Sequence, residues 1–255
     1  MRDPNSLCAF LLGLIVSSPV FAAAPGAGDV PPGWPNPIHD DAYYGFLLVD
    51  RLEVADNEGP NTLDWELVGW FGGDFNRLWL EAEGAQHLES SGGEIERLDV
   101  SWGRLIAPFW DLQLGVGTQR TYGPDEDDER HWAVVGLQGL APGMFEVDAN
   151  IRLDEEGVFA ADLEVEYDLL ITQRLMLQPS VETAIFSDSV EEFGIGEGLN
   201  RVALGLRLRY EIVRQFAPYI GVQWTRSFGE TADFARSVDE PVSETSLLAG
   251  VRMWF

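Results

Sequence analysis

Residues 202–210 read Val202-Ala203-Leu204-Gly205-Leu206-Arg207-Leu208-Arg209-Tyr210, with an apolar side chain at every second position. Strict alternation over this length is typical of a β-strand with one apolar face, because successive side chains of a strand point to opposite sides. The same alternation runs through residues 145–153, 159–167 and 247–255. These segments predict a protein built from long β-strands.

Twelve candidate strands follow one another from residue 45 to the C-terminus. Most have about the 9–11 residues that a tilted strand needs to cross a bilayer. Pro179 lies on the apolar face of one of them, and we expect a bulge there because proline donates no hydrogen bond to a neighbouring strand. The candidate strands cover residues 45–55, 62–72, 75–85, 95–106, 109–121, 131–139, 144–154, 158–168, 174–185, 199–213, 216–228 and 244–255.

Short connections between these strands alternate with long ones. Short turns on one rim and long loops on the other are typical of outer-membrane barrels. With an even number of strands, both ends of the barrel segment are expected on the short-turn, periplasmic rim. The connection at 154–158 is short for the outer rim. The tight connections are 72–74, 107–108, 141–143 and 213–215, and the long ones are 86–94, 122–130, 186–198 and 229–243.

The N-terminus has the layout of an export signal. A short segment carrying Arg2 precedes the apolar run 7–16, which is too short to span a bilayer, and small residues follow. We predict a signal peptide over residues 1–22, cleaved after Ala22, with an uncleaved anchor as the alternative. Residues 23–43 are rich in proline, glycine and alanine, which predicts a flexible periplasmic segment outside the fold.

The two faces of the candidate strands differ in chemistry. In a membrane barrel the charged face must line the lumen, because lipid cannot solvate it. In a secreted soluble β protein the charged face would point outward to water. The apolar face includes Leu63, Trp65, Leu67, Phe71, Leu98, Val100 and Trp102, and the charged face includes Asp64, Glu66, Arg77, Glu81, Glu83, Arg97, Asp99, Glu182, Arg201 and Glu211.

Several features favour the membrane version. The chain carries an export signal, aromatic residues gather near strand ends as at a membrane interface, and a closed barrel leaves no open sheet edge. The chain also stops at Phe255 after an alternating segment, as Gram-negative outer-membrane barrels commonly do, and the assembly machinery recognises such an end. The sequence therefore predicts an all-β fold: an antiparallel transmembrane β-barrel of about 12 strands over residues 44–255, in the cell outer membrane.

Composition excludes several classes of function. The formal net charge is −27, and all sixteen basic residues are arginine, so a nucleic-acid partner is not expected. The single cysteine, Cys8, lies in the export signal, which excludes a disulfide framework and a cysteine-based metal site. No long apolar run follows the N-terminus, which excludes a helical membrane bundle.

Several strings in the barrel segment resemble the copper resistance protein B family (CopB/PcoB) of Gram-negative outer membranes. The resemblance covers roughly residues 44–255, in order and at similar spacing. The strings are residues 48–53 (LVDRLE), 76–84 (NRLWLEAEG), 135–142 (VGLQGLAP), 172–179 (TQRLMLQP), 196–199 (GEGL), 206–212 (LRLRYEI), 216–222 (FAPYIGV) and 229–233 (GETAD).

The resemblance implies a barrel of a copper-resistance system that binds copper ions or passes them outward, without enzymatic activity of its own. It also implies a periplasmic multicopper oxidase and copper carriers as partners. Family members usually carry a periplasmic N-terminal stretch dense in methionine and histidine, whereas residues 23–43 contain His39 alone. Tight copper sequestration by such a tail is therefore not expected of this chain.

Two groups of residues are candidate copper ligands. Met176 falls on the lumen side of its strand with Gln178 and Glu182 after it, and the neighbouring strand offers Glu164 and Glu166. A thioether suits Cu(I), whereas imidazole with oxygen donors suits Cu(II). The alternative is that Met176 fills a gap and the carboxylates pair with lumen arginines.

The second group is His39-Asp40-Asp41, which could bind Cu(II) weakly or be a solvated linker. In the long loop, the acidic run 125–129 could attract divalent cations, including those that bridge lipopolysaccharide, although its spacing does not match an EF-hand. The alternative for this run is also a solvated charge cluster. Outer-membrane lipid and lipopolysaccharide are the expected surroundings of the barrel.

Two other functions compete with copper binding or export. One is a general porin-like or structural barrel without specific metal binding. The other is a membrane-embedded hydrolase, which needs a serine near a histidine. His87 and His131 fall in or beside loops without a convincing serine partner, so we expect no enzyme.

Overall fold

The computed structural model describes residues 42–57, 59–123 and 128–255. The predicted signal peptide, the segment 23–41 with His39, Asp40 and Asp41, and residues 125–127 of the acidic run all lie outside the described residues. Residues 43–255 form one compact unit. In the part of the chain that the structure describes, no helix is both long and apolar enough to cross a bilayer.

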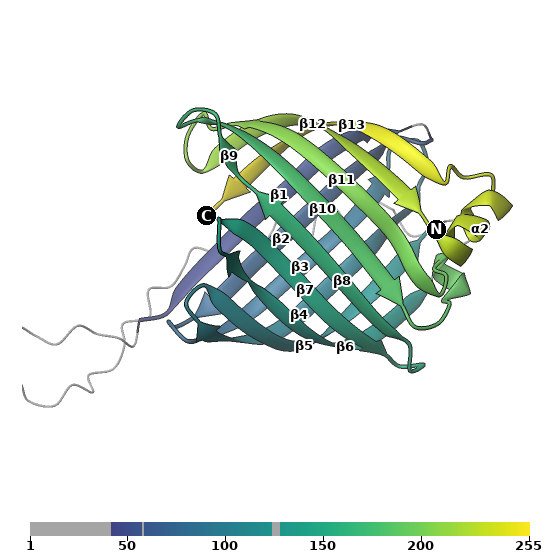
Figure 1. The fold of residues 1–255 in the computed structure, drawn as a ribbon, viewed down its shortest axis with the longest axis horizontal. Coiled ribbons are helices and arrows are strands. Elements are labelled where there is room, and N and C mark those ends of the chain that lie inside the picture. The colour runs from purple at the N-terminus through teal and green to yellow at the C-terminus, as the bar shows by residue number, and fades with distance from the viewer. Residues whose placement is uncertain (1–41, 58, 124–127) are drawn as a thin grey trace, which may run out of the picture. The chain divides into compact units, whose positions relative to one another are not determined.

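This unit is a closed antiparallel β-barrel of twelve strands (Figure 1). A two-residue strand, β9 (Leu169–Leu170), continues the pairing of β8 with β10 in the same register, so β8 and β9 together act as one barrel strand. The predicted fold class and all twelve predicted strands are confirmed, to within a few residues at their ends. The strands are β1 (Tyr44–Asp56), β2 (Thr62–Gly72), β3 (Asn76–His87), β4 (Gly93–Ala107), β5 (Trp110–Tyr122), β6 (Glu129–Ala141), β7 (Phe145–Asp154), β8 (Phe159–Tyr167), β10 (Leu175–Phe186), β11 (Gly198–Tyr210), β12 (Phe216–Ser227) and β13 (Ser243–Trp254).

The barrel closes where β13 pairs with β1. Leu48 lies opposite Trp254 in this pair, and the C-terminal residue extends the ladder. The amide of Phe255 donates to the carbonyl oxygen of Leu47 at 2.8 Å, and the amide of Leu47 donates to the carbonyl oxygen of Phe255 at 3.1 Å. The closed ladder satisfies the backbone groups that an open edge would expose to lipid.

Pro179 is accommodated without the predicted bulge. Pro179 lies opposite Leu206 in a continuous β10–β11 register, and the one register shift of that pair comes later, between Ala184 and Ile185. On the other side of β10, pairing with β8 stops at Glu166 and resumes at Leu169. The ladder on this side of β10 therefore has no pair at Pro179. No extra residue is inserted as a bulge.

Two of the long loops contain helices that the sequence did not predict. The β10–β11 loop contains the 3₁₀ turn η2 (Glu191–Phe193), and the β12–β13 loop contains α2 (Gly229–Ser237). The loops are joined because the amide of Gly196 donates to Thr231 Oγ1 at 2.9 Å. A small apolar cluster lies beside them and contains Val158, Val190 and Ile195 with Phe186 and Phe193 packed against it.

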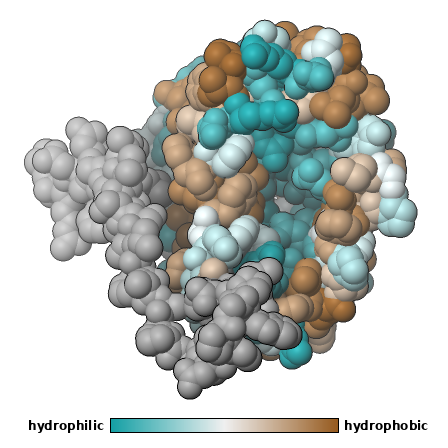
Figure 2. Space-filling view, turned by 90° about the vertical axis from the view of Figure 1, so that its left-hand side faces the viewer, coloured by the Kyte–Doolittle hydropathy of each residue, from teal (hydrophilic) through white to brown (hydrophobic). Residues whose placement is uncertain are grey.

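The two faces of the strands separate as predicted. Viewed from the end that carries the C-terminus, hydrophilic side chains surround the central hollow and hydrophobic ones cover much of the outer wall (Figure 2). Val116, for example, is 65% exposed on the outer wall, whereas Glu81 on the inner wall is 3% exposed. The inner wall of the barrel is thus polar, and much of its outer surface is apolar.

Candidate functional site: the barrel lumen

One side of the lumen is a row of carboxylates. Glu164 on β8 lies directly opposite Asp148 on β7 and directly opposite Glu182 on β10. In the same way, Glu146 on β7 lies opposite Glu166 on β8. Like charges directly opposite each other destabilise a sheet, so this row requires cations from elsewhere in the barrel.

Arg51 of β1 supplies part of that compensation. Its Nε lies 2.7 Å from Glu66 Oε2, and its Nη1 donates to Glu182 Oε1 at 2.9 Å. Its Nη2 also donates to Glu164. Each nitrogen of one guanidinium thus contacts a different glutamate, and the three glutamates come from β2, β8 and β10. The forked geometry of arginine permits this arrangement, whereas a lysine offers only a point charge.

Arg97 of β4 makes a second set of contacts beside the first. Its Nη2 lies 3.4 Å from Glu83 Oε2, and its Nη1 lies 3.5 Å from Asp148 Oδ2. Longer contacts of 3.9 Å reach Glu66 Oε1 and Glu81 Oε2. Glu66 therefore joins the two arginines. We refer to Arg51, Arg97, Glu66, Glu81, Glu83, Asp148, Glu164 and Glu182 as the lumen belt.

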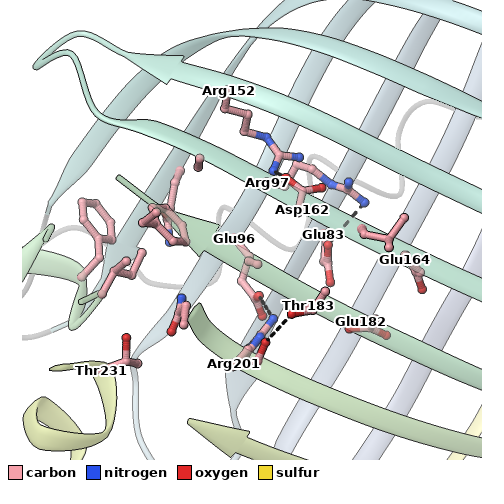
Figure 3. Close-up of a pocket in the computed structure, with 18 of the residues that line it drawn as sticks. Glu83, Glu96, Arg97, Arg152, Asp162, Glu164, Glu182, Thr183, Arg201 and Thr231 are labelled. Carbon is pink, nitrogen blue, oxygen red and sulfur yellow. Dashed lines mark hydrogen bonds and ion pairs between the residues drawn. The ribbon is translucent and has the colours of Figure 1, made fainter. Parts of the chain in front are cut away.

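An outer cavity of about 320 Å³ lies on the side of the belt that faces the long loops (Figure 3). Arg201 of β11 and Glu96 of β4 meet in it, with Nη2 3.1 Å from Oε2. Thr231 of α2 also lines the cavity, so the joined loops form part of its wall.

An inner cavity of about 670 Å³ lies on the other side of the belt. Part of its wall is aromatic: Trp70 packs with Phe46 and with Trp79, at ring-centroid distances of 6.1 Å and 6.4 Å. The guanidinium carbon of Arg77 lies 4.6 Å from the centroid of the Trp70 ring. Arg252 lies at this level, with Nε 2.7 Å from Asp50 Oδ1.

Other buried pairs fix the wall around these cavities. Arg207 of β11 makes a bidentate pair with Glu53 of β1, with Nη2 2.7 Å from Oε1 and Nε 3.1 Å from Oε2. The indole Nε1 of Trp132 donates to Asp99 Oδ1 at 2.8 Å. Gly117 makes room for that bond, because a Cβ there would lie 1.7 Å from Asp99 Oδ1.

The structure divides the predicted lumen ligands into two groups. Glu164 and Glu182 come together on Arg51. Met176 lies elsewhere: Arg209 Nη2 is 3.6 Å from its sulfur, and Arg209 Nη1 donates to Gln178 Oε1 at 3.1 Å. Glu166 joins this second group by accepting from Gln178 Nε2 at 2.8 Å.

No set of three or more His, Cys, Asp or Glu side chains within residues 42–57, 59–123 and 128–255 has an arrangement that could hold a metal ion. The copper ligands in the lumen therefore stay a prediction, and His39, Asp40 and Asp41 lie outside the described residues. The chemistry that the described lumen offers is an acidic wall in which many carboxylates, Glu164 and Glu182 among them, already contact arginine.

The other methionines and the histidines of the described residues lie at the following positions. Met144 is 65% exposed at the turn between β6 and β7, and Met253 lies in β13. His131 is exposed on β6, with Nε2 3.9 Å from Glu129 Oε1. His87 ends β3.

The sequence analysis placed Arg97 and Arg201 on the charged face and gave pairing of the carboxylates with lumen arginines as the alternative to copper binding. It did not single out Arg51 or Arg207 as partners of those carboxylates, although both fall on the charged side of their strands. Which carboxylates they contact could not be inferred, because the partners belong to strands that are distant along the chain.

Comparisons with known proteins agree with this architecture. Residues 43–255 match a family model described as "Copper resistance protein B precursor (CopB)". A "Copper resistance protein B homolog" of Pseudomonas syringae pv. tomato is 41% identical over 220 residues, which cover 86% of this chain and 72% of the homolog. "Copper resistance protein B" of Escherichia coli is 43% identical over 220 residues, with the same two coverages.

Among solved structures, the NanC porin has a similar fold. It superposes with a TM-score of 0.52 at 14% sequence identity, and the match covers 81% of this chain and 98% of the porin. At this identity the likeness shows the fold alone. It agrees with a β-barrel of the outer membrane.

Proposed function

The chain belongs to the copper resistance protein B family, and from that premise we propose that this outer-membrane barrel passes copper ions outward through its lumen. The supporting observation is the acidic wall of the lumen. The inner cavity is lined by seven acidic residues and by two arginines, Arg77 and Arg252, and the two arginines of the lumen belt contact three of the seven acids, so acidic groups remain in excess. A cavity with this excess of negative charge raises the local concentration of cations.

The donors in the lumen favour transient contact over tight storage. Carboxylate oxygens are hard ligands, and the soft thioether of Met176 contacts the guanidinium of Arg209. The guanidinium of Arg209 beside the Met176 sulfur opposes the approach of another cation. We therefore propose passage as the main activity and weak binding at Met176, Glu164, Glu166 and Glu182 as a step in it.

A porin-like or structural barrel without specific metal binding is the second candidate. The specific observation that favours it is that Arg51 already contacts both Glu164 and Glu182. Such ion pairs could stabilise the barrel without any role in metal binding.

Copper flux and copper binding separate these two functions. The purified barrel is reconstituted into two sets of vesicles, one enclosing a copper-sensitive dye and the other a magnesium-sensitive dye, and the matching ion is added outside. Passage predicts faster quenching than in vesicles without protein, and quenching by copper that exceeds the response to magnesium. Equal responses to both ions would leave the porin-like function standing. No quenching above protein-free vesicles would leave the structural barrel.

A titration with matched methionine variants tests the predicted ligands. We expect Met176→Ala to weaken copper binding, whereas Met144→Ala, at an exposed turn, serves as the control. His39→Ala tests the N-terminal group in the same way. Identical binding by Met176→Ala, His39→Ala and the control would exclude these residues as ligands.

We further propose partners and the absence of catalysis. A periplasmic multicopper oxidase and copper carriers would deliver the ion, and Phe255 would be recognised by the barrel assembly machinery. Lipid and lipopolysaccharide would surround the wall. Co-purification of the barrel with a periplasmic oxidase tests the first of these, and an esterase assay with the wild-type barrel tests for hydrolysis, which we expect to be absent.

A further inference from the structure

Arg51 contacts glutamates of both cavities, and Asp148, which Arg97 contacts, also borders both. Of the three glutamate partners of Arg51, Glu182 borders the outer cavity, Glu66 borders the inner cavity, and Glu164 borders both. Arg51 itself is only 8% exposed. A path from one cavity to the other along these glutamates therefore meets the guanidinium of Arg51.

The contacts of Arg51 also cross the lumen. Arg51 is on β1 and Glu164 is on β8, which is five strands away around the barrel by the shorter route through β13, β12, β11 and β10. A single arginine side chain thus reaches almost to the opposite wall. At this level its side chain therefore crosses much of the lumen.

The charges at this level are unequal. The lumen belt contains six carboxylates but only two guanidiniums. If the guanidinium of Arg51 moves aside, three carboxylates from three different strands face the open path. A ring of carboxylates favours cations and repels anions.

We propose that Arg51 is the residue that closes this lumen to ions and sets its preference for cations. Its guanidinium is a tethered cation that occupies the place between Glu66, Glu164 and Glu182, and a passing cation takes that place when Arg51 swings away. The proposal rests on the proposed passage of ions through the lumen. It concerns closure and charge selectivity, and it is independent of which cation is the natural cargo.

Conductance measurements in potassium chloride test this without copper. The barrel is purified from outer membranes and inserted into planar bilayers, and the reversal potential is measured under a salt gradient. We expect severalfold higher single-channel conductance for Arg51→Gln than for wild type, with a reversal potential that indicates cation preference. Arg226→Gln is the matched control, because it makes the same change of charge at an exposed position near the outer end of β12.

A second variant covers the case in which Arg51→Gln fails to fold. Arg51→Gln combined with Glu182→Gln removes one cation and one anion, so the net charge of the lumen stays as in the wild type, although Glu66 and Glu164 still lose their contact with Arg51. We expect this double variant also to conduct severalfold more than wild type, with weaker cation preference than the single variant. Folding is confirmed by the heat-modifiable band on a gel.

The outcomes distinguish this proposal from the proposed function. A folded variant lacking Arg51 that conducts no more than wild type and Arg226→Gln overturns the closure role. An open variant that prefers anions overturns the selectivity role. Open, cation-selective variants whose vesicles show no copper flux above magnesium would support the role of Arg51 and contradict copper as the cargo.

Discussion

Arg51 and Glu182 lie 131 positions apart in the sequence, and their side chains meet inside the barrel, with Nη1 2.9 Å from Oε1. The same guanidinium contacts Glu66 and Glu164. One arginine on β1 thereby neutralises part of a carboxylate row built by β8 and β10. This relationship explains how a sheet can place acidic residues directly opposite each other and remain folded.

The Glu53–Arg207 pair should contribute strongly to stability. Its side chains are 3% exposed, so Arg207→Gln leaves a buried carboxylate without its cation and should cost about 3–5 kcal/mol of unfolding free energy. The measurement is urea unfolding in lipid vesicles, followed by the heat-modifiable band. The double variant Glu53→Gln/Arg207→Gln should recover part of the loss, because neither charge is left alone.

The control for this pair is Arg236→Gln in α2. Arg236 pairs with Asp233, and both side chains are more than half exposed, so its loss should cost less than about 1 kcal/mol. Equal costs for Arg207→Gln and Arg236→Gln would show that the buried pair is not a stabilising contact.

Gly117 should be intolerant of a side chain. A Cβ at this position would lie 1.7 Å from Asp99 Oδ1 and 2.4 Å from Trp132 Nε1. Gly117→Ala should therefore break the Asp99–Trp132 hydrogen bond and cost about 1–3 kcal/mol through overpacking. Gly45→Ala is the matched control, because its Cβ would meet the nearest atom at an ordinary 3.6 Å. If both variants refold with wild-type stability, the packing described around Gly117 is wrong.

The sidedness of the wall can be tested with two valines of equal exposure. Val116 and Val238 are each 65% exposed, but Val116 lies in the middle of β5 and Val238 follows α2 in the loop. Val116→Arg should cost about 2–4 kcal/mol in a bilayer, because a charge near the midplane faces lipid. Val238→Arg should be nearly neutral. Similar stabilities of the two variants in bilayers would contradict a lipid-facing wall at Val116.

The side chain of Phe255 should matter for assembly more than for stability. Phe255 pairs with Leu47 through two backbone hydrogen bonds, which Phe255→Ala retains, while its exposed ring is lost. We expect reduced amounts of the heat-modifiable band in outer membranes of cells but normal refolding of the purified variant in vesicles. Wild-type amounts in cells would argue against recognition through the aromatic ring.

Much of the fold could be predicted because it depends on a local pattern. Alternation at 202–210 and at eleven other segments identifies each strand, and burial of the charged face follows from the insolubility of charge in lipid. The helix α2 was not predicted because the segment 229–237 is short and largely polar. The helix lies in the outer loop region, and contacts with another loop, such as the hydrogen bond between Gly196 and Thr231, hold it in place.

The candidate site was predicted only in part. The sequence placed Met176, Glu164, Glu166 and Glu182 on the lumen side, but it could not show that Arg51 holds two of these glutamates while Arg209 contacts the methionine. Their copper-binding role stays a prediction. Ion-pair partners in a barrel depend on the stagger between strands and on the width of the lumen, and both arise only when the sheet closes.

The amino-acid sequence by itself determined the strands, their two faces, the alternation of short and long connections and the membership in a copper-resistance family, because each of these is encoded within or between neighbouring segments. Only the tertiary structure decided that β13 closes on β1, that the lumen is divided near Arg51, and that an acidic wall is neutralised from the far side. The closure depends on backbone pairing between the first and last strands, and the other two features depend on side chains that meet across the barrel, where distance in space is unrelated to distance along the chain.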